Sequence, residues 1–258
     1  MMSRFRRPGR LALAARIVAA ALAVVAALGA PGVQAQVSAA PSPAAHATAQ
    51  TRWHDAFAAF DKADRENPPA SDGVVFVGSS TIRLWTRLAD DFRAQPVVVN
   101  RGFGGSTMAD CSLLAQELVV RYRPRQVVVY AGDNDLAEGR TPFQVLESFA
   151  HFANTVRAAL PTTRISFISV KPSPSRAALL PKIQETNHIV GAYLRTQANT
   201  DYIDIFTPML GADGRPRTEL FRADMLHMNE SGYRIWQAAI APYLLAPADV
   251  AAVNSPPR

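Results

Sequence analysis

The stretch VVFVGSST, residues 74–81, determines the fold that the sequence predicts. It begins with apolar, mostly β-branched residues and ends in a glycine followed by three hydroxyl side chains. Strands of a parallel sheet are covered by helices on both faces, so they read as uninterrupted apolar runs. We predict that residues 74–77 form such a strand and that it ends at Gly78.

Four more runs of this kind follow, and segments with helical character separate them. The expected strands lie at 97–99, 127–131, 165–170 and 202–206. The expected helices lie at 52–65, 81–89, 108–122, 142–159, 180–198 and 229–244. This alternation predicts a three-layer α/β/α sandwich with a five-stranded parallel sheet, whose functional groups gather at the carboxyl ends of the strands.

Local signals support several of these helices. Trp53, Phe57 and Phe60 recur at helical spacing, which indicates an amphipathic first helix. Pro142 suits the first turn of its helix, and Asn229 suits the N-cap of the last one.

The first 35 residues have the layout of a secretory signal peptide. Arginines precede an apolar run at 17–30, and the small-residue sequence VQA follows at 33–35. A retained membrane anchor is the alternative, but the run is shorter than the roughly 20 residues of a spanning helix. We expect an exported protein, periplasmic or extracellular, with no stable membrane insertion after cleavage.

The remaining chain divides by composition. Residues 36–51 are rich in Ala, Pro, Ser and Thr and are expected to form a flexible linker. Residues 52–246 form the expected globular domain, and residues 247–258 are expected to be a disordered tail.

Charge and cysteine content narrow the class of protein. The chain carries 27 Lys+Arg and 21 Asp+Glu, a net charge of +6, but five of the arginines lie in residues 1–35. Their removal leaves 22 basic against 21 acidic residues, so bulk charge gives no support to a nucleic-acid partner. The single cysteine, Cys111, allows no intramolecular disulfide and is expected to be a buried apolar residue.

Polar residues and glycines follow the predicted strands. They lie in GSST at 78–81, NRGFGGS at 100–106, GDND at 132–135, and DMLH at 224–227, just before the last helix. Each segment alone is a weak signal. The carboxyl ends of parallel strands share one edge of the sheet, so we expect these segments to meet.

Their residue types together suit acyl transfer. A serine hydroxyl is a poor nucleophile at neutral pH and needs an adjacent base, for which histidine is suited. A carboxylate then orients the imidazole. We therefore expect Ser80 to be the nucleophile, His227 the base and Asp224 the orienting acid.

Ester cleavage also builds negative charge on the carbonyl oxygen, which needs pre-set hydrogen-bond donors. The backbone N–H groups of Ser80 and Gly105 and the side-chain amide of Asn134 could supply three such donors.

The four segments resemble those of the SGNH, or GDSL, hydrolases. Ser80 matches the nucleophile of the first segment, Gly105 and Asn134 match the oxyanion-hole residues, and Asp224 and His227 match the final Asp-x-x-His. The match covers about residues 70–245 and is most similar to the subgroup that includes platelet-activating-factor acetylhydrolase catalytic subunits. This resemblance implies a flavodoxin-like sandwich and no metal or nucleotide cofactor.

One position departs from the family pattern. The first segment of the family often reads Gly-Asp-Ser, whereas Ser79 stands here in place of the Asp. Two serines therefore compete as nucleophile. We prefer Ser80 because its spacing from Gly78 matches the motif and because it lies nearer the start of the next helix.

The sequence does not support several other kinds of functional site. The sequence has neither a Gly-x-Ser-x-Gly elbow nor a phosphate loop. The histidines lack paired ligand spacing, so no metal site is expected. Asp133 and Asp135 are expected mainly as loop and cap residues, and Ser106 as a turn residue.

The substrate is left open by the sequence. Trp85, Phe103 and the loop 171–176 could line a substrate pocket, and the alternative for Trp85 and Phe103 is packing in the core. We expect a small-molecule or glycan ester as substrate. Three hypotheses follow: hydrolysis of carboxylic esters with short acyl groups, O-deacetylation or acyl transfer on a carbohydrate or cell wall, and a non-catalytic binding module.

Overall fold

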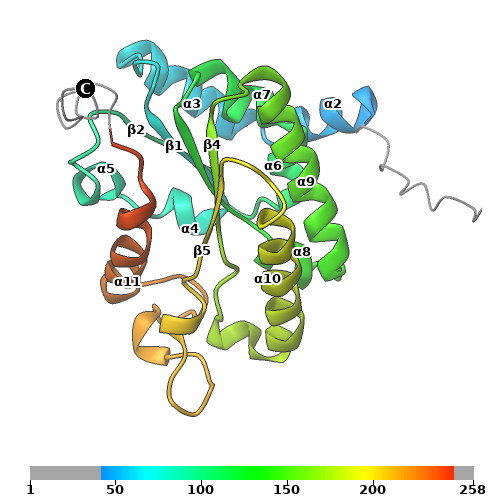
Figure 1. The fold of residues 1–258 in the computed structure, drawn as a ribbon, viewed down its shortest axis with the longest axis vertical. Helices are drawn as coiled ribbons and strands as arrows, with labels where there is room; N and C mark the ends of the chain where they lie inside the picture. The colour runs from blue at the N-terminus through cyan, green and yellow to red at the C-terminus, as the bar shows by residue number, and fades with distance from the viewer. Residues whose placement is uncertain (1–41, 247–258) are drawn as a thin grey trace, which may run out of the picture. The chain divides into compact units, whose positions relative to one another are not determined.

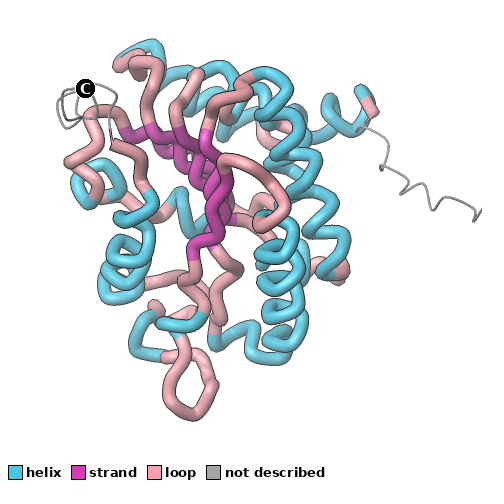
Figure 2. The backbone as a smooth tube through the Cα atoms, in the orientation of Figure 1, coloured by secondary structure: helices cyan, strands magenta, loops and turns pink. Residues whose placement is uncertain are grey.

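A computed structural model of the chain describes residues 42–246 and shows a five-stranded parallel sheet between two layers of helices (Figures 1 and 2). The sheet order is β2-β1-β3-β4-β5. The strands are β1 (Val74–Gly78), β2 (Val98–Gly102), β3 (Gln126–Tyr130), β4 (Arg164–Ile168) and β5 (Thr200–Ile203). The predicted fold class is confirmed. The expected signal peptide at 1–35 and tail at 247–258 lie outside the described residues.

The helices fall between the strands, as Figure 1 shows. The α-helices are α2 (Pro43–Arg52), α3 (His54–Glu66), α4 (Ser80–Arg83), α5 (Leu88–Asp91), α6 (Met108–Leu113), α7 (Ala115–Leu118), α8 (Asp133–Ala137), α9 (Pro142–Ala159), α10 (Leu180–Leu194) and α11 (Glu230–Ile240). Short 3₁₀ helices are η1 (Val120–Tyr122), η2 (Pro174–Leu179), η3 (Thr207–Met209), η4 (Thr218–Leu220) and η5 (Ala241–Tyr243). Among residues 42–246, no helix is both long enough and apolar enough to cross a membrane.

The apolar run that predicts β1 supplies both halves of the core. Val74 and Phe76 face a cluster built with α4, α5 and α11, whereas Val75 and Val77 face a cluster built with α6, α9 and α10. All four side chains are at most 1% exposed. Burial of one such side chain contributes about 1.5–3 kcal/mol, so β1 anchors the sheet against both layers.

Helix starts follow the predicted local signals. Pro142 occupies the first turn of α9, and Thr141 caps it in a reciprocal capping box with Gln144. The Asn229 side chain accepts from Gly232 N–H at the start of α11. These caps satisfy backbone groups that a helix end otherwise leaves unpaired.

The prediction of a flexible linker over 36–51 is wrong for the part that the structure describes. Residues 43–52 form α2, which Ser42 caps by accepting from Ala45 N–H at 3.2 Å. Ala49 is 4% exposed in the core, and the His46 ring lies 2.9 Å from a Glu117 carboxylate oxygen. The alanine-rich composition taken for a linker is also a strong helix former once a cap and a packing face are available.

Two predicted helices are broken in the structure. The segment 81–89 becomes α4 and α5, and Trp85 between them is buried and donates its indole N–H to Asp91 at 2.7 Å. The segment 108–122 becomes α6, α7 and η1. The spacing of apolar residues identifies these regions as helical, but it cannot show where tertiary packing interrupts a helix with a turn.

Candidate active site

The sheet order brings three of the sequence-predicted segments to one edge. β1 lies between β2 and β3, and Gly78 is in register with Gly102 and Tyr130. The chain leaves β1 for β2 on one side and reaches β3 on the other, and open α/β sheets bind ligands at such switch points. Ser80, Gly105 and Asn134 follow these three strand ends within a few residues.

Gly78 is required at this edge by close backbone contact. Its φ is +150°, and a Cβ added there would lie 1.9 Å from the Tyr130 carbonyl oxygen. The absence of a side chain lets the chain turn from β1 into α4, which begins at Ser80. The turn therefore presents Ser80 at the end of the strand.

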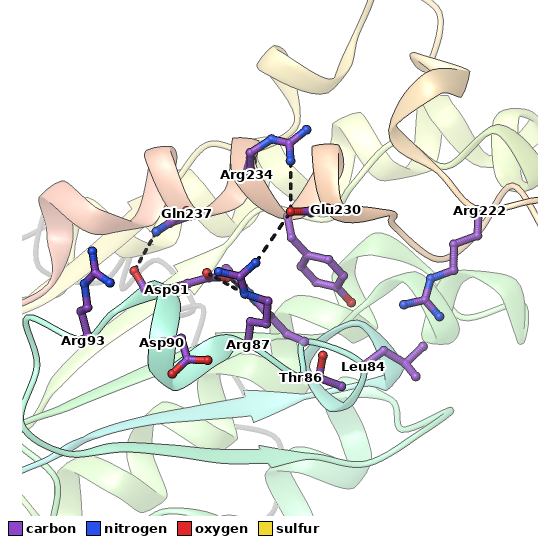
Figure 3. A pocket seen from close by; sticks show the side chains of 12 residues that line it. Leu84, Thr86, Arg87, Asp90, Asp91, Arg93, Arg222, Glu230, Arg234 and Gln237 are labelled. Atoms are coloured by element: carbon purple, nitrogen blue, oxygen red, sulfur yellow. Dashed lines mark hydrogen bonds and ion pairs between the residues drawn. The ribbon is translucent and has the colours of Figure 1, made fainter.

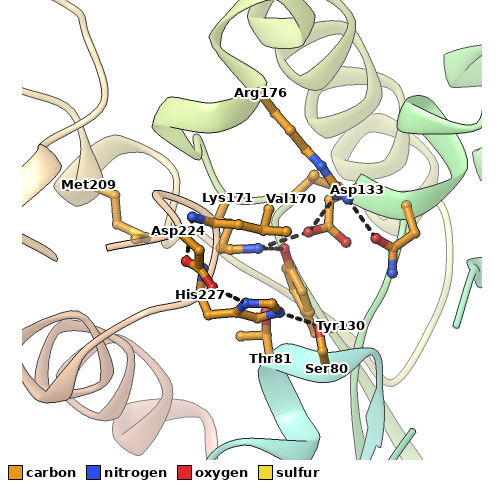
Figure 4. A network of polar contacts seen from close by, with 12 residues as sticks. Ser80, Thr81, Tyr130, Asp133, Val170, Lys171, Arg176, Met209, Asp224 and His227 are labelled. Atoms are coloured by element: carbon orange, nitrogen blue, oxygen red, sulfur yellow. Dashed lines mark hydrogen bonds and ion pairs between the residues drawn. The ribbon is translucent and has the colours of Figure 1, made fainter. Parts of the chain in front are cut away.

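The loop before α11 meets this turn, as Figure 4 shows. The Ser80 hydroxyl oxygen lies 2.9 Å from His227 Nε2, and His227 Nδ1 lies 2.7 Å from Asp224 Oδ2. Three residues from two distant parts of the chain thus form a continuous hydrogen-bonded relay.

The Asp224 carboxylate determines the tautomer of the neutral His227 ring. The hydrogen bond from that ring, and then the backbone N–H groups of His227 and Leu226, hold the pKa of Asp224 well below its ordinary value. An ionised carboxylate only accepts hydrogen bonds, so Nδ1 carries the ring proton of the neutral imidazole. Nε2 is then the acceptor, and the Ser80 hydroxyl donates to it.

The structure distinguishes the two adjacent serines. The Ser79 side chain is buried, and its hydroxyl oxygen has no hydrogen-bond partner within the described part of the chain. Ser80 is partly exposed and contacts the imidazole. The geometry places Ser80, rather than Ser79, beside the base.

Gly105 and Asn134 follow β2 and β3, the two strands that flank β1 in the sheet. Gly105 is exposed with a φ of +84°, a conformation that favours glycine. Asn134 Nδ2 donates to the Ser106 carbonyl oxygen at 2.9 Å, which joins α8 to the segment after β2. Between residues 42 and 246, the backbone N–H groups of Ser80 and Gly105 donate to no protein acceptor and are available to a ligand.

Figure 4 shows a buried ionic network around Asp133 of α8 that we did not predict from the sequence. Lys171 Nζ donates to Asp133 Oδ2 at 2.8 Å and to the Tyr130 hydroxyl at 3.1 Å, and the Arg176 guanidinium lies 3.1 Å from Asp133 Oδ2. The side chains of Lys171 and Asp133 are only 1% and 3% exposed. The expectation that Asp133 is a loop or cap residue is therefore incomplete, because it carries a buried ion pair.

The Asp133 carboxylate in this network keeps its negative charge although it is buried. Burial alone would raise the pKa of Asp133, but the charges of Lys171 and Arg176 outweigh it and hold that pKa below its ordinary value. Burial also lowers the pKa of Lys171, although the contact with Asp133 opposes this effect. A signal was present in the loop 171–176, whose basic residues directly follow β4, but the sequence does not show which acid pairs with them.

A second buried acid, Asp135, contacts the start of α6, which follows the glycine-rich segment. Asp135 is fully buried and accepts from Met108 N–H at 2.8 Å, at the first residue of α6. Burial raises the pKa of Asp135 to about 6. Cys111 is buried as expected, and burial followed by the nearby charges of Asp110 and Asp135 raises the pKa of its thiol.

Two aromatic residues with an open assignment are buried in the core, and Trp85 also contributes to the lining of a pocket. Phe103 is fully buried, and Trp85 is 2% exposed. Trp53 packs edge-on against Phe103 with ring centroids 4.9 Å apart, and its Cη2 would lie 3.9 Å from a Cβ at Gly105. Trp53, predicted only as part of a helix face, therefore borders the site.

A pocket of about 500 Å³ (Figure 3) has none of the predicted catalytic or oxyanion-hole residues in its lining. Its lining comes from the segment 84–87 between α4 and α5, from α5 and Arg93, and from Arg222 and α11. Arg87 and Arg234 both contact Glu230, at 3.7 and 3.3 Å, so the charges that line it are largely paired with one another. Within the described ranges, no three His, Cys, Asp or Glu side chains converge as metal ligands.

Comparisons with known proteins agree with this architecture. A structure from Streptococcus pneumonia, provisionally described as a platelet activating factor, is similar with a TM-score of 0.67 and 18% identity, covering 79% of this chain and 100% of that chain. A GDSL-like lipase from Bacteroides thetaiotaomicron is similar with a TM-score of 0.63 and 24% identity, covering 72% and 96%. A carbohydrate esterase family 3 protein from Talaromyces cellulolyticus is similar with a TM-score of 0.52 and 20% identity, covering 66% and 94%.

These structural similarities show a shared fold. No curated protein matches the chain at a significant level. The sequence profile of the GDSL-like lipase/acylhydrolase family matches residues 71–235, which include β1 to β5 and both ends of the Ser80–His227 contact. The chain therefore belongs to the GDSL-like lipase/acylhydrolase family.

Proposed function

We propose that this protein hydrolyses carboxylic esters through a covalent acyl-enzyme on Ser80. The observation that carries the proposal is the relay from Ser80 through His227 to Asp224, with contacts of 2.9 and 2.7 Å, at the switch point of a GDSL-type sheet. A hydroxyl that donates to a neutral imidazole, itself oriented by a carboxylate, is the arrangement that activates serine.

The reaction proceeds in two halves. Ser80 Oγ attacks the ester carbonyl carbon while its proton passes to His227 Nε2, which gives a tetrahedral oxyanion and an imidazolium. His227 then protonates the leaving alcohol as the carbon–oxygen bond breaks, leaving an acyl group on Ser80. Water repeats the same steps, releasing the carboxylic acid and free Ser80.

The oxyanion is stabilised by donors already in position. We assign this role to the backbone N–H groups of Ser80 and Gly105 and to the side-chain amide of Asn134. The two backbone groups have no protein acceptor in the part of the chain that the structure describes. Loss of one such donor lowers the rate by about 10²–10³-fold.

The exposure of the site favours small acyl groups. The Asp224 side chain is 48% exposed and that of His227 is 24% exposed. An open site of this kind offers little enclosed apolar surface for a long acyl chain. Similarity to a carbohydrate esterase favours one second candidate, the removal of acyl groups from a glycan.

The proposal is tested with short aryl esters. Wild-type protein should hydrolyse 4-nitrophenyl acetate, Ser80→Ala should lose that activity, and Ser79→Ala, altered at a buried neighbour, should retain it. Activity that survives in Ser80→Ala but disappears in Ser79→Ala would overturn the assignment. Acyl chains of increasing length, compared with an acetylated polysaccharide, separate a general short-chain esterase from a glycan deacetylase.

We also propose that the protein is exported. The support is the arginine-rich start, the apolar run at 17–30 and the VQA sequence at 33–35. Expression of the full chain in a Gram-negative host should yield a species in the periplasm or medium that begins after Ala35. Recovery of the intact chain from the cytosol would contradict export.

A further inference from the structure

We propose that Arg176 is a positioning residue that fixes the Asn134 side-chain amide in the orientation required for oxyanion binding. This inference rests on the proposed function. Its basis is a contact that the reaction steps do not use: the Arg176 guanidinium donates to Asn134 Oδ1 at 2.8 Å.

Chemistry alone assigns the two ends of the Asn134 amide. Arginine has donors only, so the amide atom facing Arg176 must be the oxygen. A carbonyl oxygen accepts only, so the atom facing the Ser106 carbonyl, at 2.9 Å, must be the nitrogen. The amide nitrogen has two hydrogens, and one remains for an oxyanion after Ser106 takes the other.

Arg176 also forms an ion pair with a buried carboxylate. Its second terminal nitrogen lies 3.1 Å from Asp133 Oδ2, and the buried Lys171 holds the same carboxylate oxygen at 2.8 Å. The Arg176 side chain is 15% exposed. An oxyanion donor stabilises best when its orientation does not change during the reaction, and this network resists such a change.

The segment that carries Arg176 also contacts the loop of the general base. Ser175 N–H donates to the Met225 carbonyl oxygen at 3.0 Å, and Met225 lies between Asp224 and His227. η2 therefore links the oxyanion side of the site to the acid–base side.

The geometry requires an arginine. One terminal nitrogen contacts Asp133 and the other contacts Asn134. A lysine has one ammonium group and cannot provide this fixed fork. Arg176→Lys should keep a positive charge beside Asp133 while losing the hold on Asn134.

A double-mutant cycle tests the proposal on the full chain with 4-nitrophenyl acetate. Asn134→Ala should lower kcat by about 10²–10³-fold. Arg176→Ala should lower kcat by about 10–10²-fold, a fraction of that loss, with KM changed less than about twofold. Since Arg176 acts through Asn134, adding Arg176→Ala to Asn134→Ala should lower kcat by less than about twofold more.

Arg164→Ala is the matched control. Arg164 also pairs with a mostly buried acid, Asp201, but at the start of β4, the opposite end of the strand from the site. Its removal should lower Tm and leave kcat within about twofold. Arg176→Lys should keep a Tm near that of wild type and still show the loss in kcat, and it replaces Arg176→Ala in the cycle if that variant is unfolded at the assay temperature.

The kinetic results distinguish a failure of the Arg176 inference from a failure of the proposed oxyanion role of Asn134. Additive losses in the double variant would show that Arg176 acts independently of Asn134 and would overturn the inference. Unchanged kcat in Arg176→Lys would overturn it as well. Unchanged kcat in Asn134→Ala would instead refute the oxyanion role in the proposed function, which is a different failure.

Discussion

Replacement of Lys171 by methionine should destabilise the protein strongly. The substitution keeps an unbranched side chain of similar length but removes the ammonium that contacts Asp133. Both side chains are almost fully buried, at 1% and 3% exposure. The Asp133 carboxylate would remain in the interior without its closest charged partner.

The size of the effect follows from these contacts. Removal of one partner of a buried ion pair costs about 3–5 kcal/mol, because an uncompensated charge remains. Asp133 keeps one further cation, Arg176, at 3.1 Å. We therefore expect the lower end of that range, a loss of about 3 kcal/mol in the free energy of unfolding.

Urea denaturation at pH 7 of wild type, Lys171→Met and the double variant Lys171→Met/Asp133→Asn measures this loss. The double variant should be more stable than Lys171→Met, because neutralising Asp133 removes the stranded charge. A loss below about 1 kcal/mol in Lys171→Met, or a double variant less stable than the single one, would refute the burial argument.

Three other changes have defined outcomes. Burial raises the pKa of Asp135 from 3.8 to about 6, so its contribution to stability is complete below about pH 4 and declines as pH rises to 6. Urea titrations at pH 4 and 7 should show wild type losing about 2 kcal/mol of unfolding free energy relative to Asp135→Asn. Gly78→Ala should cost at least about 3 kcal/mol in the same assay, because its Cβ would overlap the Tyr130 carbonyl oxygen. Asp224→Asn should lower kcat about 10³-fold or more without unfolding the protein, since His227 loses its tautomer control; an effect below tenfold in steady-state kinetics would contradict that role.

The sheet and the main site residues could be predicted because their signals are local. The run at 74–77 is apolar on both faces, and that pattern alone indicates a buried parallel strand. The topology then brings the ends of β1 and β3 to one edge, so Ser80 and Asn134 could be expected there, whereas His227 lies well after β5 and reaches Ser80 from the loop before α11.

Features that depend on distant partners could not be predicted. The sequence shows Lys171 as a charged residue after a strand, and only the fold reveals that Asp133 makes its burial tolerable. The same limit applies to α2, whose alanines read as a linker until Ala49 is seen packed in the core. Local composition does not encode these contacts.

The identity of the attacking serine can be measured directly with a fluorophosphonate, which forms a stable bond with an activated serine hydroxyl. Wild-type protein should gain one adduct, and peptide mass spectrometry should place it on Ser80, with labelling abolished in Ser80→Ala and retained in Ser79→Ala. An adduct on Ser79, or no adduct on active wild-type protein, would show that the relay from Ser80 to His227 is not the reactive centre.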